Sequence, residues 1–163
     1  LGMVPLMRLE DGSLLSENAA ILQYIAGRYP DAGLGARDDL ERAKLQQWLC
    51  FIGTELHKAL FIPLFEKALG EDAKQHARDK GKSRLAYLNN YLTCREFLLS
   101  RFTVADAYLY TVLNWSMATA VDLAPWPAVQ SYFKRLQTRP SVAKAFKEEL
   151  ALYKAEQTRH QAA

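Results

Sequence analysis

A threonine and an aspartate three residues apart introduce the most apolar stretch of the chain, and this feature constrains the fold most. Thr103 and Asp106 have the spacing of a capping box, in which each side chain satisfies a backbone N–H group of the other residue. The residues that follow are apolar at helical spacing: Ala105, Tyr108, Leu109, Val112 and Leu113. A helix that is apolar nearly all round lies in the middle of a helical domain. The sequence therefore predicts a buried helix behind a structural capping box, with no chemistry of its own.

The composition is typical of a soluble globular protein. Half of the 163 residues are hydrophobic, and Lys plus Arg outnumber Asp plus Glu by only 21 to 18. This excess is too small to indicate a nucleic-acid or membrane partner. We expect no apolar run long enough to span a bilayer, no signal peptide and no metal site. Two isolated cysteines, Cys50 and Cys94, favour a reducing compartment, and we expect a cytoplasmic protein.

The first thirty residues predict a β-hairpin followed by a helix. Met3 to Leu9 has a strand pattern, Asp11-Gly12 is a strong turn signal, and Ser13 to Ser16 predicts a short return strand. The helix that follows offers free N–H groups and a positive dipole end at its N-terminus, which suit a carboxylate. Glu17 beside it suits an ammonium group, so the two together would hold an α-amino acid. From this stretch alone, the simpler interpretation is a Ser16 cap and a Glu17 that complements the dipole.

In combination, these features resemble the second half of the thioredoxin-like, glutathione-binding domain of the glutathione transferase family. The shared features are Val4-Pro5, the hairpin and the run over residues 16–21. The resemblance implies a cis Val4–Pro5 bond and a Val4 main chain that pairs with the cysteinyl part of glutathione. It also implies that Glu17 and Asn18 bind the γ-glutamyl end. Asn18 departs from the family, which usually has serine here and in some bacterial members glycine.

A second domain is expected after a linker that contains glycine. We expect residues 31–37 to be this linker and residues 38–163 to form an all-α domain, so that residues 1–30 belong to a separate one. The long helix after the linker has an apolar core stripe, and Pro63 should end or kink it. Small residues on a second stripe leave room beside His57.

Two parts of the helical domain extend the resemblance to the bacterial beta class. The run over residues 54–58 resembles that class, in which the matching His57 and Lys58 line the glutathione site. A structural role for His57 is given equal weight. Trp115 matches a position that lines the hydrophobic substrate pocket, although a buried tryptophan is by default a core residue. A basic run over residues 74–84 is most simply a solvated helix face.

The resemblance spans essentially the whole chain and implies an α+β, mostly α fold. A partial thioredoxin-like domain, one hairpin plus one helix, precedes an all-α glutathione-transferase C-terminal domain. The implied protein is a homodimeric enzyme without a metal that conjugates its substrate glutathione to hydrophobic electrophiles. The family begins with a β-α-β unit that carries the catalytic residue. Because none of that unit is in this sequence, we expect a fragment that lacks the activating residue.

Two other functions stay open at this point. The first is a non-catalytic glutathione-transferase-like module that serves in dimerisation or protein contact. The second is a helical domain that binds nucleic acid, which the isolated basic run supports only weakly.

Overall fold

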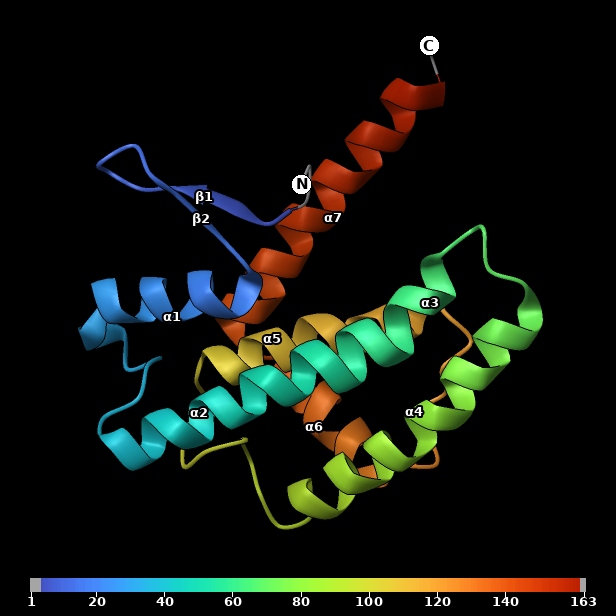
Figure 1. Ribbon diagram of the computed structural model, residues 1–163, viewed down its shortest axis with the longest axis horizontal. Coiled ribbons are helices and arrows are strands. Elements are labelled where there is room, and N and C mark those ends of the chain that lie inside the picture. Colours follow the sequence, from blue (N-terminus) through green and yellow to red (C-terminus); the bar gives the residue numbers. More distant parts are fainter. Residues whose placement is uncertain (1–3, 162–163) are drawn as a thin grey trace.

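The computed structural model describes residues 4–161 and is mostly helical, with one two-stranded hairpin near its N-terminal end (Figure 1). β1 (Leu6–Arg8) pairs antiparallel with β2 (Leu14–Ser16), and α1 (Asn18–Arg28) follows directly. The predicted hairpin and helix are thus confirmed, and the predicted α+β, mostly α fold is as observed. Met3, which was expected to open the first strand, lies outside the described residues.

The remaining helices form one bundle around α5. Eight of the eleven residues of α5 are buried, and α5 packs against α1, α2, α6 and the π-helix η2. Figure 1 shows the last helix, α7, projecting away from the bundle. The bounds are η1 (Pro30–Ala32), α2 (Asp39–Phe51), η2 (Ile52–Phe61), α3 (Ile62–Phe65), α4 (Glu71–Leu92), α5 (Val104–Asn114), η3 (Trp115–Ala118), α6 (Pro127–Gln137) and α7 (Pro140–Gln161).

The segments α2, η2 and α3 follow one another as a single helix of 27 residues, Asp39–Phe65. With a mean hydropathy of 1.3 over its most apolar window, this helix is long and apolar enough to cross a membrane by length and composition. The expectation that no segment reaches this length is therefore wrong. The apolar residues of this helix form one wall of the hydrophobic core. The following side chains are buried there: Leu45, Trp48, Leu49, Ile52, Leu56, Leu60 and Phe61.

The long helix does not end at Pro63, one of the two outcomes predicted for it, because the helix continues to Phe65. The winding changes to π just before the proline, so that the N–H of Ile62 donates to the carbonyl of His57, five residues back. Pro63 therefore occupies the first turn of a new α segment, where a missing N–H is tolerated.

Three basic residues of α4 form ion pairs. Arg84 contacts Glu55 of η2 at 2.9 Å, Lys82 contacts Asp79 at 2.7 Å, and Arg78 contacts Glu71. Three positive charges of the run are thus already paired with carboxylates of the same chain.

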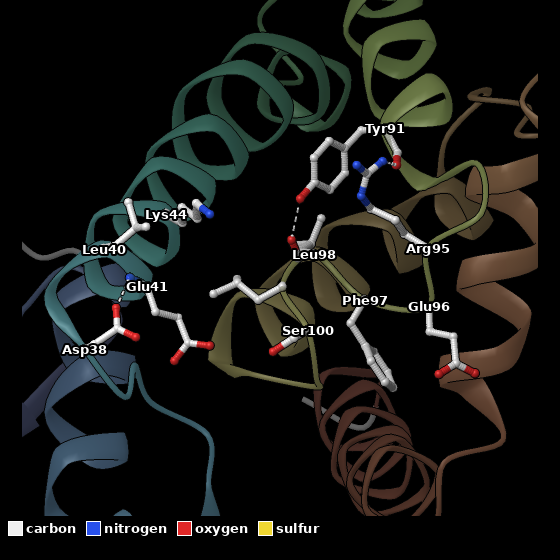
Figure 2. Close-up of a pocket in the computed structure, with 11 residues that line it drawn as sticks. Asp38, Leu40, Glu41, Lys44, Tyr91, Arg95, Glu96, Phe97, Leu98 and Ser100 are labelled. Atoms are coloured by element: carbon white, nitrogen blue, oxygen red, sulfur yellow. Dashed lines mark hydrogen bonds between the residues drawn. The ribbon is translucent and has the colours of Figure 1, made fainter.

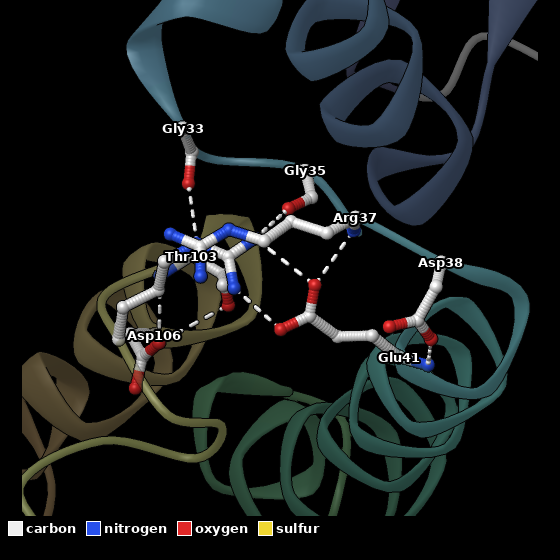
Figure 3. Close-up of polar contacts among 8 residues, drawn as sticks. Gly33, Gly35, Arg37, Asp38, Glu41, Thr103 and Asp106 are labelled. Atoms are coloured by element: carbon white, nitrogen blue, oxygen red, sulfur yellow. Dashed lines mark hydrogen bonds and ion pairs between the residues drawn. The ribbon is translucent and has the colours of Figure 1, made fainter.

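The predicted capping box is present at the start of α5, and its aspartate does more than cap the helix (Figure 3). Asp106 Oδ2 accepts from the N–H of Thr103 at 2.8 Å and from its hydroxyl at 3.1 Å. Asp106 Oδ1 accepts from the N–H of Leu98 at 2.9 Å and from the hydroxyl of Tyr132 at 2.8 Å. Burial raises the pKa of the Asp106 carboxyl, and these four hydrogen bonds oppose the rise. Asp106 therefore joins the loop before α5, the start of α5 and the middle of α6.

Arg101 ties the segment between α1 and α2 to the bundle. Its Nε donates to the carbonyl of Gly33 at 3.0 Å, and its guanidinium donates to the carbonyl of Gly35 and to both carboxylate oxygens of Glu41. Glu41 also accepts from the N–H of Arg37 at 2.6 Å. Because the Arg101 and Glu41 side chains are only 17% and 14% exposed, this pair lies out of reach of most solvent. The residues expected to be a linker are thus held by polar contacts on both sides.

Candidate functional site

The first predicted site residues lie where the hairpin meets α1. Leu6 pairs with Ser16, so Pro5 enters the strand pair next to the point at which the chain leaves it toward Glu17. The Val4–Pro5 bond is cis, as the resemblance implies, and Val4 is exposed. The hairpin register therefore brings the two predicted segments, Val4-Pro5 and Glu17-Asn18, close together.

Glu17 is the N-cap of α1, and it has an unusual backbone. Its φ of 70° lies in the left-handed region that favours glycine, and no side chain caps this helix. The alternative in which Ser16 provides the cap is therefore wrong. The Glu17 side chain is exposed, and within residues 4–161 no ion pair involves its carboxylate. Backbone conformations of this kind cluster at ligand-binding sites, where the surrounding structure holds them in place.

Tyr108 of α5 connects this helix start to the predicted imidazole. Its hydroxyl lies 2.7 Å from Nδ1 of His57, which belongs to η2. The side chain of Asn18 faces the same hydroxyl. Burial raises the pKa of the Tyr108 hydroxyl; Asn18 lowers it, and the negative charge of Glu17 raises it again. The structure thus brings Asn18 and His57, which are 39 positions apart in the sequence, onto one tyrosine.

His57 is half-buried on the side of η2 that also carries Gly53, as the stripe of small residues predicts. A Cβ atom at Gly53 would lie 3.6 Å from the Tyr108 hydroxyl, so the backbone of η2 is close to that group. Burial, and to a smaller extent the charge of Lys58, lowers the pKa of His57 below its usual 6.5. The Lys58 side chain is exposed. His57 is therefore a neutral imidazole at pH 7, next to an exposed positive charge.

An aromatic wall adjoins His57. The Trp115 ring lies edge-on to that of His57, with 4.8 Å between their centroids, and its centroid is 6.0 Å and 5.7 Å from those of Phe61 and Phe65. Trp115 and Phe65 are partly exposed, whereas Phe61 is buried. The residue predicted for an apolar substrate pocket thus stands beside the residue predicted for glutathione.

Tyr108 is the site residue that our sequence reasoning missed. We assigned it to the core stripe of α5, and at 7% exposure most of its ring does lie there. The available signal was its hydroxyl, because a buried tyrosine O–H usually requires a hydrogen-bond partner. No such partner lies nearby in the sequence, and only the folded chain supplies one.

This arrangement suits a ligand with a zwitterionic end and a thiol. A helix N-terminus attracts a carboxylate, and the free carboxylate of Glu17 attracts an ammonium group. A neutral imidazole can donate one hydrogen bond and accept another. The partly exposed ring of Trp115 offers an apolar surface on the far side of His57.

A hollow lies elsewhere, between the start of α2 and the loop before α5 (Figure 2). It has a volume of about 630 Å³, and several of its polar groups already bind other groups of the chain. Tyr91 donates to the carbonyl of Leu98 at 2.7 Å, Arg95 donates to the carbonyl of Tyr91 at 2.7 Å, and Glu41 binds Arg101. None of the predicted ligand-binding residues lines it, so it does not compete as the candidate site.

Comparison with known proteins defines the class. Residues 48–140 match the family described as glutathione S-transferase, C-terminal domain. Glutathione S-transferase GstA of Escherichia coli O157:H7 is 39% identical over 150 residues, which cover 91% of this chain and 74% of the relative. The chain belongs to the glutathione S-transferase family.

Solved structures agree with this assignment and refine it. A bacterial beta-class glutathione S-transferase from Sphingomonas chungbukensis is 42% identical, with a TM-score of 0.85. A sphingomonad glutathione S-transferase complexed with glutathione is 41% identical, with a TM-score of 0.84. Each match covers 91% of this chain and 74% of the solved one. The similarity thus includes bacterial and beta-class members, and about a quarter of each relative lies outside the match.

Proposed function

We propose that this protein binds glutathione and transfers it to hydrophobic electrophiles. The glutathione-binding residues would be Val4, Pro5, Glu17, Asn18, His57 and Lys58, and Trp115 would line the electrophile pocket. The observation that carries the proposal is the meeting of Asn18, Tyr108 and His57 at one point, beside the free carboxylate of Glu17. Residues 1–30 would form the glutathione-binding part, and residues 38–163 would supply His57, Lys58 and Trp115 from the helical domain.

The proposed reaction is a nucleophilic substitution or addition by the glutathione thiolate. With an aryl halide, the sulfur forms a bond to the ring carbon, the carbon–halogen bond breaks, and halide leaves; the thiol proton passes to solvent. The thiolate, and not the thiol, is the nucleophile. The protein would contribute by holding the sulfur near the electrophile and by stabilising its negative charge. A donor that faces the sulfur serves both purposes.

A chimera provides the test of this function. In one protein Leu1–Ala163 stands alone, and in the other it follows the β-α-β unit of a beta-class relative. We expect conjugation of a chromogenic aryl halide by the chimera only, because Leu1–Ala163 offers the binding groups without the activating residue expected upstream. Equal activity of the two proteins would move the activating role onto residues of this chain. A folded chimera that binds glutathione without turnover would favour a scaffold instead.

Within that chimera, Glu17→Ala should weaken glutathione binding more than His57→Ala. Glu17 would meet a ligand charge, and hydrogen bonds to charged groups contribute about 1.5–3 kcal/mol, or roughly 10- to 150-fold in affinity. His57 is neutral, and we expect its loss to reduce affinity by roughly fivefold. Calorimetric titration with glutathione measures both. The reverse order would make His57 the primary ligand.

We expect the chimera to be a homodimer with twofold symmetry. Sedimentation at micromolar concentration measures this, and a monomer alone would contradict it. Both cysteines of the chain are free, which suits the reducing cytoplasm.

A further inference from the structure

The contact between Tyr108 and His57 contains information about where the hydrogen atoms are. The hydroxyl oxygen and Nδ1 are separated by 2.7 Å. Within residues 4–161, this Nδ1 is the one hydrogen-bond partner recorded for the hydroxyl. A phenol proton that pointed elsewhere would lose this acceptor in a part-buried site, so the tyrosine is the donor and Nδ1 the acceptor.

The donor hydrogens available on Tyr108 and Asn18 agree with a hydrogen bond from Tyr108 to His57. Tyr108 has a single hydroxyl proton, and if that proton lies toward His57, the oxygen is left with only lone pairs for Asn18. The amide of Asn18 lies nearby and has two N–H donors, which suit an oxygen that offers only lone pairs.

We propose that Tyr108 is a positioning residue of the glutathione site: its hydroxyl donates to Nδ1 of His57 and keeps the proton of the neutral imidazole on Nε2. With Nδ1 occupied, Nε2–H is the donor that His57 offers to a bound thiolate or carboxylate. This role toward the ligand rests on the proposed function. Within residues 4–161, Nε2 of His57 takes part in no hydrogen bond. The neutral imidazole thus presents a defined donor to the ligand, which an unconstrained ring would present only part of the time.

The capping box gives this arrangement its rigidity. Tyr108 lies two positions after Asp106, in the second turn of α5, and both are buried. The four hydrogen bonds of Asp106 fix the start of the helix to the loop before it and to α6. The Tyr108 hydroxyl is therefore carried on a rigid helix. Through its hydrogen bond to Nδ1, this hydroxyl fixes the orientation of the His57 ring.

Nitrogen NMR of the histidine rings tests the proposal on Leu1–Ala163 itself, without glutathione. We expect His57 at neutral pH to carry its proton on Nε2, and we expect Tyr108→Phe to introduce a second form with the proton on Nδ1. Asn18→Ala should produce a smaller amount of the same form. Tyr110→Phe is the matched control, since Tyr110 lies on the same helix, is equally buried, and has a hydroxyl without a hydrogen-bond partner. Exposed His76 is the internal reference.

The result that would overturn the proposal is a wild-type His57 with its proton on Nδ1, or a Tyr108→Phe variant whose ring nitrogens match the wild type. Glutathione affinity is the second measurement, and it tests whether the tautomer matters for binding.

In the chimera, Tyr108→Phe should weaken glutathione binding by roughly fivefold, and Tyr110→Phe should leave it unchanged. Equal affinities in the wild type and Tyr108→Phe would refute the positioning role. A chimera that binds no glutathione would contradict the proposed function, and the ring spectra would still decide on the tautomer.

Discussion

Asp106→Ala should lower the free energy of unfolding by about 3–5 kcal/mol, which exceeds the usual loss of about 0.5–2 kcal/mol for a removed cap. The alanine leaves the N–H groups of Leu98 and Thr103 and the Tyr132 hydroxyl without their acceptor. Each buried donor without a partner costs about 1–3 kcal/mol. Removal of the carboxylate also relieves the desolvation that raises its pKa, so the net loss is smaller than the sum. Urea unfolding measures the change as a lower midpoint with an unchanged slope.

The matched control is Asp122→Ala, which removes another aspartate that accepts a backbone N–H. Asp122 is exposed, and its Oδ1 accepts from the N–H of Ala124 at 2.8 Å. Water replaces that bond, so we expect a loss below about 1 kcal/mol. Tyr132→Phe, which removes one of the four bonds of Asp106, should fall between the two. Similar midpoints for Asp106→Ala and Asp122→Ala would mean that the box contributes only as an ordinary surface cap.

The capping box shows which part of this fold can be predicted from sequence. Thr103 and Asp106 are three positions apart, and their mutual bonds follow from helix geometry alone. Leu98 and Tyr132 are the other two partners, and Tyr132 comes from a different helix 26 positions away. That contact depends on how α5 and α6 pack, which the apolar stripes predict only as a general association of helices.

The same distinction explains the outcome at the candidate site. Glu17 was predicted from a local pattern, and Asn18 and His57 from the resemblance of short runs of sequence to the family. Tyr108 was not predicted, because the groups near its hydroxyl come from α1 and η2. The π winding of η2 was also missed. An α-helix and a π-helix bury the same kind of apolar residues, and over ten residues the pattern does not distinguish the two periods.

Glu41→Gln should lower the free energy of unfolding at pH 7 by about 1.5–3 kcal/mol, the range for hydrogen bonds to charged groups, because the pair is partly buried. The amide keeps the shape of the side chain but leaves the guanidinium of Arg101 without its counter-charge. The matched control is Asp39→Asn. Asp39 lies two positions earlier on α2 and is 95% exposed in its ion pair with Arg42, so we expect a loss of at most about 1 kcal/mol.

The pH dependence identifies the charge as the cause. The hydrogen bond from Arg101 is the main reason that the pKa of Glu41 lies below its usual 4.5. A carboxylate with a lowered pKa in the folded state stabilises the fold fully above its unfolded pKa, and this contribution is lost as the pH falls through the folded value. The difference between wild type and Glu41→Gln should therefore be constant from pH 7 to about pH 5.5 and shrink progressively below pH 4.5. Asp106 has the opposite shift, but it is present in both proteins and cancels in the difference. Urea titrations at pH 7, 5.5, 4 and 3 measure this, and a difference that stays constant to pH 3 would mean that packing, and not charge, holds Arg101 in place.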